Sequence, residues 1–221
     1  MLQATPPNFH LYALVPAEEA FRLPSRRSFS VHTCGPATAL FGRSRPGANA
    51  VLAALRHDRI VRLALARCSS VVPFRLGLEI ASVADLDALF RLNSWQLAGQ
   101  LARFHGRVEM GLKVGLSPSA TDPSSLLPRG LDRIRGLAPE PADRCERLDF
   151  SRKGGAHGKI FVANYLISRH AIDDFWQATE GIRRLAPELP LLGSGPWAAY
   201  SFCDVPLRRA APVQTALGSE V

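Results

Sequence analysis

Hydrophobic and polar residues alternate along several stretches of the chain. In the stretch VVPFRLGLEI, residues 71–80, this period of two predicts a strand with one apolar and one polar face. The apolar face would hold Val72, Phe74, Leu76, Leu78 and Ile80. The polar face carries Arg75 and Glu79, with Gly77 between them. Such a face either performs chemistry or serves to align a sheet.

Similar alternation predicts other strands, and apolar residues spaced three or four apart predict helices. Strands are expected at residues 9–16, on both sides of Gly35-Pro36, and at 71–80, 107–116, 159–168 and 189–203. Helices are expected at residues 48–68, 82–105, 127–137 and 169–186. Ser82 with Asp85 forms a capping box at the start of the second helix. In the first helix, Leu52, Leu55, Ile60 and Leu63 are expected on one side, with the arginines mostly opposite.

Strands interleaved with two amphipathic helices predict an α+β protein of two domains. We expect residues 1–116 to form a ferredoxin-like sandwich in which the helices cover one face of the sheet. Five prolines between residues 117 and 157 predict a linker. Residues 158–221 are expected to form a smaller α+β domain with a C-terminal tail.

Composition changes this picture little. The chain has 221 residues and a net charge of +8, and 24 of its 27 basic residues are arginines spread along its whole length. An Arg-rich nucleic-acid-binding module is therefore one alternative, although no recognised nucleic-acid motif accompanies the charge. The four cysteines form no CxxC pair, so neither a zinc site nor a disulfide framework is indicated. Without an apolar run of ~20 residues or a signal peptide, we expect a cytoplasmic protein that binds no membrane.

Candidate catalytic groups are few. His32 and Cys34 lie two apart on a predicted strand and would share a face, so an enzyme acting on a small molecule through this pair is a second alternative. His170 with Asp173 and Asp174 has the spacing of metal ligands but lacks a third ligand type nearby, and the two aspartates suit the first turn of a helix. We therefore predict no catalytic residue, no metal and no cofactor, and the residues alone leave the enzyme alternative open.

The polar face of residues 71–80 has a structural explanation. If this strand lies antiparallel to residues 107–116, then Arg75 and Glu79 oppose Glu109 and Lys113 in matched pairs, each contributing about 0.2–1 kcal/mol. Gly77 would then allow close approach of a neighbouring group. A deep cleft lined by this polar face, with a histidine or cysteine converging on it, would point to chemistry instead.

Three segments in order resemble the GvpL/GvpF family of gas vesicle proteins. LYALVPA is similar to the family's opening LYG-V-PA, and RHDRIVRLALARCSSVVPFRLGLEIAS resembles its RHE-VV…VLPLRFGT-FAS block. GPWAAYSF is similar to the closing GPWPPYSF, matching at Trp197, Tyr200 and Phe202. Ala198-Ala199 replace the two prolines, and residues 118–152 have no clear counterpart.

The resemblance implies not an enzyme but an accessory or minor structural protein of gas vesicles, which are protein shells filled with gas. It implies binding to the small hydrophobic major shell protein and to other accessory proteins while a vesicle nucleates. Trp197, Tyr200 and Phe202 are the candidate partner-binding residues, because aromatic side chains often anchor interfaces. Packing between the domains is the competing interpretation of these three residues.

Overall fold

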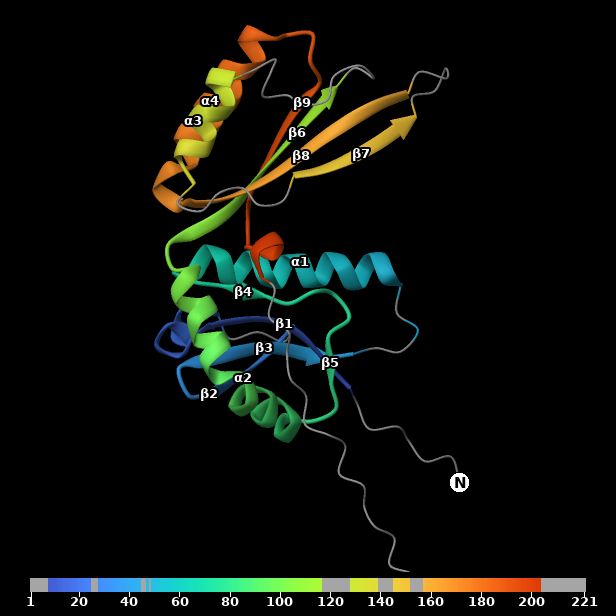
Figure 1. Ribbon diagram of the computed structural model, residues 1–221. Coiled ribbons are helices and arrows are strands. Elements are labelled where there is room, and N and C mark those ends of the chain that lie inside the picture. The colour runs from blue at the N-terminus through green and yellow to red at the C-terminus, as the bar shows by residue number, and fades with distance from the viewer. Residues whose placement is uncertain are drawn as a thin grey trace, which may run out of the picture.

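The computed structural model describes residues 8–24, 28–44, 47, 49–116, 128–138, 145–151 and 157–203. Within these ranges the chain forms two antiparallel sheets, each with its own helices, stacked one above the other in Figure 1. The prediction of a two-domain α+β protein is confirmed.

The first sheet is built mainly from the N-terminal strands β1 (Phe9–Pro16), β2 (Ser30–Cys34) and β3 (Ala37–Arg43). Its strand order is β2-β3-β1-β4, where β4 (Val72–Pro73) is short and β5 (Glu79–Ile80) also pairs with β1. The hairpin between β2 and β3 turns at Gly35, whose φ of 59° suits a glycine. The predicted strands on both sides of Gly35-Pro36 are therefore confirmed.

Two helices pack on opposite faces of this sheet: α1 (Ala50–Arg67) and α2 (Val83–Arg103). The side chains of β1 alternate accordingly, since Tyr12 and Val15 pack with α1 while Leu11 and Leu14 pack with α2. The prediction that both helices cover one face is wrong, because β1 and β3 are apolar on both sides and each side needs a cover.

The second sheet has the order β7-β8-β6-β9, and α3 (Pro128–Gly136) and α4 (Ile172–Leu185) lie together beside it in Figure 1. Its strands are β6 (Arg107–Leu116), β7 (Cys145–Ser151), β8 (His157–Ser168) and β9 (Leu191–Trp197). Three short 3₁₀ helices complete the described elements: η1 (Ala17–Arg22), η3 (Arg169–Ala171) and η4 (Tyr200–Phe202). The segment predicted to be a linker therefore contains a helix and a strand.

Strand β6 lies in the second sheet, whereas we expected it in the first. It pairs with β8 and β9, so the chain changes sheets between α2 and β6, before the predicted boundary at residue 116. Residues 71–80 are also not one strand. They form β4 and β5 on either side of a turn in which the Leu78 N–H donates to the Arg75 carbonyl at 3.3 Å.

These two facts overturn the proposed charge pairing of residues 71–80 with residues 107–116. Arg75 and Glu79 have no register with Glu109 and Lys113, because β5 pairs with β1 and β6 belongs to the other sheet. Gly77 has open space where a Cβ would stand, and its φ of 94° is the reason for a glycine here. The alternating pattern predicted one continuous strand, whereas a turn interrupts these residues.

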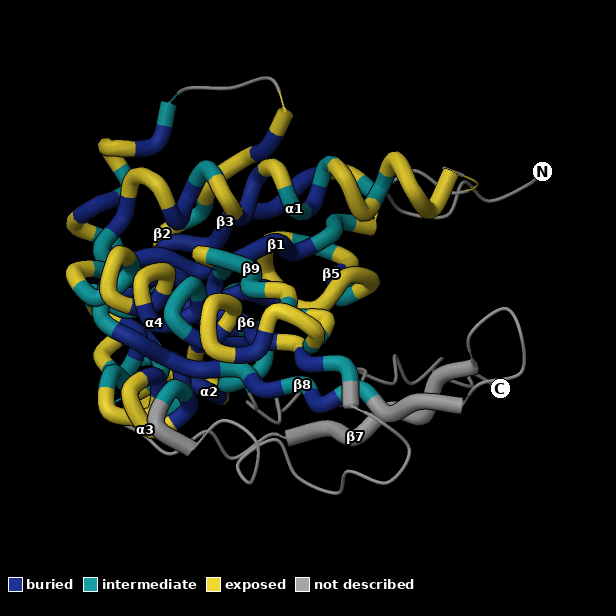
Figure 2. Tube along the Cα trace, turned by 90° about the horizontal axis from the view of Figure 1, so that it is seen from above, coloured by how far each residue is buried: buried dark blue, intermediate teal, exposed yellow. Residues whose placement is uncertain are grey.

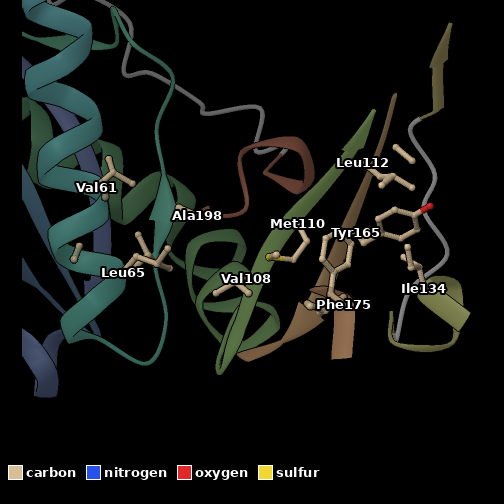
Figure 3. Packing of buried hydrophobic residues seen from close by; sticks show 14 of the residues in the cluster. Val61, Leu65, Val108, Met110, Leu112, Ile134, Tyr165, Phe175 and Ala198 are labelled. Atoms are coloured by element: carbon tan, nitrogen blue, oxygen red, sulfur yellow. The ribbon is translucent and has the colours of Figure 1, made fainter. Parts of the chain in front are cut away.

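A shared hydrophobic core joins the two sheets. One cluster of buried residues runs without a break from Val61 and Leu65 on α1, through Val108 and Met110 on β6, to Phe175 on α4 (Figure 3). Figure 2 shows buried positions in the strands of the first sheet and in β8. The two sheets with their helices are therefore held together by a hydrophobic core that both share.

The exposed side of α1 differs from its prediction. Ile60 is buried as expected, but Leu52 and Leu55 are 64% and 60% exposed. Arg59 and Arg62 are exposed as well. The N-terminal leucines thus lie with arginines on the free side of the helix, because the core below contacts the side that carries Val61 and Leu65.

Candidate functional site

The segment after β9 crosses from the second sheet back to the first. Trp197 ends β9, and the Arg62 guanidinium of α1 lies 4.3 Å from the centroid of the Trp197 ring. Arg62 also forms an ion pair of 2.8 Å with Asp58, one turn earlier on α1. A cation–π contact of this kind contributes about 0.5–1 kcal/mol at an exposed site. Trp197 therefore joins β9 to the outer side of α1.

Tyr200 joins the same segment to a pair of histidines, the buried His57 and the partly buried His10. Its hydroxyl lies 3.1 Å from Nε2 of His57 on α1, and His57 Nδ1 lies 2.7 Å from Nε2 of His10 on β1. The three rings form a continuous hydrogen-bonded chain, with Tyr12 packed edge-on against both histidines. When both imidazoles are neutral, each of the two contacts can hold one proton, so that each has one donor and one acceptor.

Burial holds both histidines in this neutral form. The pKa of His57 is lowered from 6.5 to about 4, chiefly by burial and also by the neighbouring His10, although a backbone hydrogen bond at Phe74 and the charge of Asp58 raise it. The pKa of His10 is lowered too, chiefly by burial, against the opposing charge of Glu79. Burial also raises the pKa of the Tyr200 hydroxyl, which remains protonated and available as a donor.

Ser201 fixes the segment to the second sheet. Its backbone N–H donates to one oxygen of Glu109 at 2.8 Å, and its hydroxyl donates to the other at 2.7 Å. The Asn164 amide of β8 in turn donates to the Ser201 hydroxyl at 2.8 Å. Glu109 is 6% exposed, so these bonds compensate for burying its carboxylate.

Phe202 completes the crossing. Its carbonyl accepts a hydrogen bond of 3.1 Å from Arg103 at the end of α2, and its ring packs against the core of the first sheet. The structure thus brings Trp197, Tyr200 and Phe202 together at the junction of the sheets, where they contact α1, His57 and α2. All three side chains are partly buried.

A pocket of about 640 Å³ opens beside the turn at Gly77. Its polar lining includes His10, Tyr12, Arg43, Arg56 and Glu79, and its apolar lining includes Leu52 and Leu76. Of the polar face of residues 71–80, Gly77 and Glu79 line this pocket beside His10, whereas Arg75 does not line it. No cysteine lines it among the described residues. We consider it a candidate binding pocket.

Glu79 also helps to align the first sheet, as expected of the polar face of residues 71–80, but its partners differ from the predicted ones. The Asn8 amide donates to one carboxylate oxygen at 3.1 Å, and the Ser44 hydroxyl donates to the other. These bonds tie β5 to the residue before β1 and to the residue after β3.

The pair of His32 and Cys34 gains a carboxylate that sequence reasoning missed. Asp87 on α2 lies 2.8 Å from His32 Nε2. It also contributes to raising the pKa of Cys34, for which burial is the larger cause. A raised pKa disfavours the thiolate, which is the reactive form of cysteine, so this arrangement is poorly suited to nucleophilic catalysis.

His170 lies in η3, and its backbone N–H donates to the Ser168 hydroxyl at 3.3 Å. Across the described part of the chain, no group of three or more His, Cys, Asp or Glu side chains could hold a metal ion. Asp173 and Asp174 occupy the first turn of α4, where negative carboxylates interact favourably with the positive end of the helix dipole.

The family model described as "Gas vesicle synthesis protein GvpL/GvpF" matches residues 10–153 and 140–204. The chain belongs to the GvpL/GvpF family. The sequence resemblance is thereby confirmed, and the protein is a gas vesicle protein.

Individual GvpL/GvpF proteins agree with this assignment. Gas vesicle protein F of Haloferax mediterranei is 29% identical over 140 residues, and gas vesicle protein F2 of Halobacterium salinarum is 26% identical over 142 residues. Each match covers 62% of this chain, and the chain spans about three fifths of the length of these curated relatives.

The fold is that of solved GvpF proteins. The crystal structure of GvpF from Anabaena sp. PCC7120 matches with a TM-score of 0.67 over 93% of this chain and 99% of that one, at 16% identity. GvpF from Microcystis aeruginosa matches with a TM-score of 0.62, at the same identity, over 90% of this chain and 99% of that one. Within the described ranges, no helix of this GvpL/GvpF protein is long and apolar enough to span a membrane.

Sequence reasoning missed several residues of the junction. His10 was not singled out, and Glu109 was expected to align a strand rather than to hold Ser201. Each lies far along the chain from its partner, and no local spacing reports contacts between residues 47 or 92 positions apart.

Proposed function

We propose that this protein acts in gas vesicle assembly, as an accessory or minor structural component that binds the hydrophobic major shell protein and other accessory proteins during nucleation. The observation that carries the proposal is the family match, which extends from residue 10 to residue 204. The likeness in fold to two GvpF crystal structures supports it. On this proposal the protein works in the cytoplasm, at the growing vesicle.

The junction supports a role as a scaffold. A protein that holds an aggregation-prone subunit benefits from a platform whose parts keep a fixed relation, because less conformational freedom is lost on binding. Here a shared core, the Ser201–Glu109 bonds and the Tyr200–His57–His10 chain hold the two sheets together.

The experiment removes this chain from a gas vesicle gene cluster expressed in a vesicle-free host. We expect no vesicles by electron microscopy, and restoration when the chain is supplied again. A tagged chain should also retain the purified major shell protein on a column. Vesicles of normal number and shape without the chain, together with no retention of the shell protein, would refute the proposal.

Trp197, Tyr200 and Phe202 remain candidates for contact with the shell protein, since each keeps an accessible part. Trp197→Ala should lower retention of the shell protein if the ring anchors the partner. The same variant should unfold with a free energy lower by about 1 kcal/mol, from the lost cation–π contact. If a folded Trp197→Ala variant retains the shell protein at the wild-type level, Trp197 serves only to hold the junction together and does not anchor the partner.

A further inference from the structure

The N-terminal half of α1 presents an apolar surface that no described residue covers. Val51, Leu52 and Leu55 are 65%, 64% and 60% exposed, and Leu76, on the turn across the Gly77 pocket from Leu52, is 50% exposed. Figure 1 shows these first turns of α1 projecting beyond the point where η4 crosses the helix. We call these four residues the leucine ridge.

Two arginines that form no ion pair with a described acidic residue border the leucine ridge. A helix advances by about 100° per residue, so Leu52, Leu55 and Arg59 lie within about 60° of one another on the free side of α1. Arg43 lines the Gly77 pocket on one flank of the ridge. Among the described residues, neither Arg43 nor Arg59 forms an ion pair.

Hollows on both flanks give these arginines room to receive a ligand group. The Gly77 pocket holds about 640 Å³ beside Leu52 and Leu76. A second hollow of about 720 Å³ is lined by Leu55, Arg59 and Ile60.

We propose that the leucine ridge with Arg43 and Arg59 is a docking surface for an amphipathic helix of a partner protein, with acidic residues beside its apolar stripe. The inference rests on the proposed function, since it assigns the surface that a gas vesicle partner would use. The apolar stripe packs on Leu52, Leu55 and Leu76, and the flanking carboxylates meet the unpaired arginines. Charge complementarity selects this occupant, because a basic helix would meet arginines on both flanks.

The test uses two synthetic 18-residue helical peptides with the same leucine stripe, one flanked by glutamates and the other by lysines. Fluorescence anisotropy with the full chain should show binding of the acidic peptide at least tenfold tighter than that of the basic peptide. Arg59→Glu and Leu55→Ser should each weaken acidic-peptide binding at least fivefold. Matched controls are Arg67→Glu, at the other end of α1, and Leu185→Ser, a leucine of α4 that is 75% exposed. Both controls should bind as the wild type does.

Equal binding of the two peptides, or equal losses in the controls, would overturn the inference. So would dimerisation of the wild type that Leu55→Ser abolishes in sedimentation, since a second copy would then occupy the ridge. Retention of the purified shell protein by the same variants separates this inference from the proposed function. If the wild type retains the shell protein and Leu55→Ser retains it equally, the docking inference is wrong and the proposed function stands. If the wild type does not retain it and vesicles form normally without the chain, the proposed function is refuted.

Discussion

Protonation of His57 should weaken the junction between the two sheets. His57 is 5% exposed and is held between His10 and Tyr200 at 2.7 and 3.1 Å. Its folded pKa is lowered from 6.5 to about 4, so the unfolded chain takes up a proton at a higher pH than the folded chain does. Stability should therefore be fully present above about pH 6.5 and should be lost progressively as the pH falls toward 4.

The magnitude follows from the two pKa values. If solvent screening is ignored, the difference between the two pKa values lowers the free energy of unfolding by about 2 kcal/mol from pH 7.5 to pH 5. We expect about half of this, about 1 kcal/mol, because solvent reaches part of the cluster and screens it. Two groups modulate the effect: His10, whose own lowered pKa acts in the same direction, and Asp58, whose charge favours the protonated form of His57.

The assay is urea unfolding followed by fluorescence at pH 7.5 and pH 5, for the wild type and for His57→Gln. The wild type should lose about 1 kcal/mol more than the variant over this interval. His105→Gln, which alters an exposed histidine after α2, should lose as much as the wild type. Equal losses in the wild type and His57→Gln would refute the role that we assign to the pair of histidines.

Three further substitutions test other parts of the account by chemical unfolding. Glu109→Ala should lower the free energy of unfolding by about 2–3 kcal/mol, because it leaves Ser201 without the acceptor of two hydrogen bonds, whereas Glu188→Ala, at an exposed position after α4, should change it little. Ser82→Ala should cost about 1 kcal/mol through loss of the N-cap of α2, and Ser82→Asp, which restores an acceptor, should recover most of it. Gly77→Ala should cost about 1–2 kcal/mol because of its φ of 94°, and Gly99→Ala, inside α2 with open space around it, should stabilise instead.

Local patterns predicted the elements well and their neighbours poorly. Phe9–Pro16 forms the expected strand and Ser82 caps the expected helix, because both depend on residues a few positions apart. The pairing of β6 with β8 and β9 depends on contacts between residues more than 40 positions apart, which no period of two encodes. The prediction of one strand over residues 71–80 was wrong for a different reason. A turn at Gly77 keeps the alternation of residue types while it interrupts the strand.

The candidate site shows the same division. The closing aromatic residues could be singled out, because a family pattern names them, but their contacts with His57 and Arg62 could not be foreseen. Helical spacing grouped Leu52 and Leu55 correctly and then placed them on the wrong side of α1. Only the position of the core, set by Val61 and Leu65, decides which side of that helix is free.

The exposed and buried sides of α1 therefore serve different purposes. The buried side carries His57 and Val61, which the closing segment and the second sheet cover. The exposed first turns carry Leu52 and Leu55, which would reduce solubility if they had no use, since exposed apolar patches favour association. A mutation at Leu52 or Leu55 should therefore change binding without changing stability, and a mutation at His57 should do the reverse. Stability lost in Leu55→Ser, with binding kept, would show that this division of the helix is wrong.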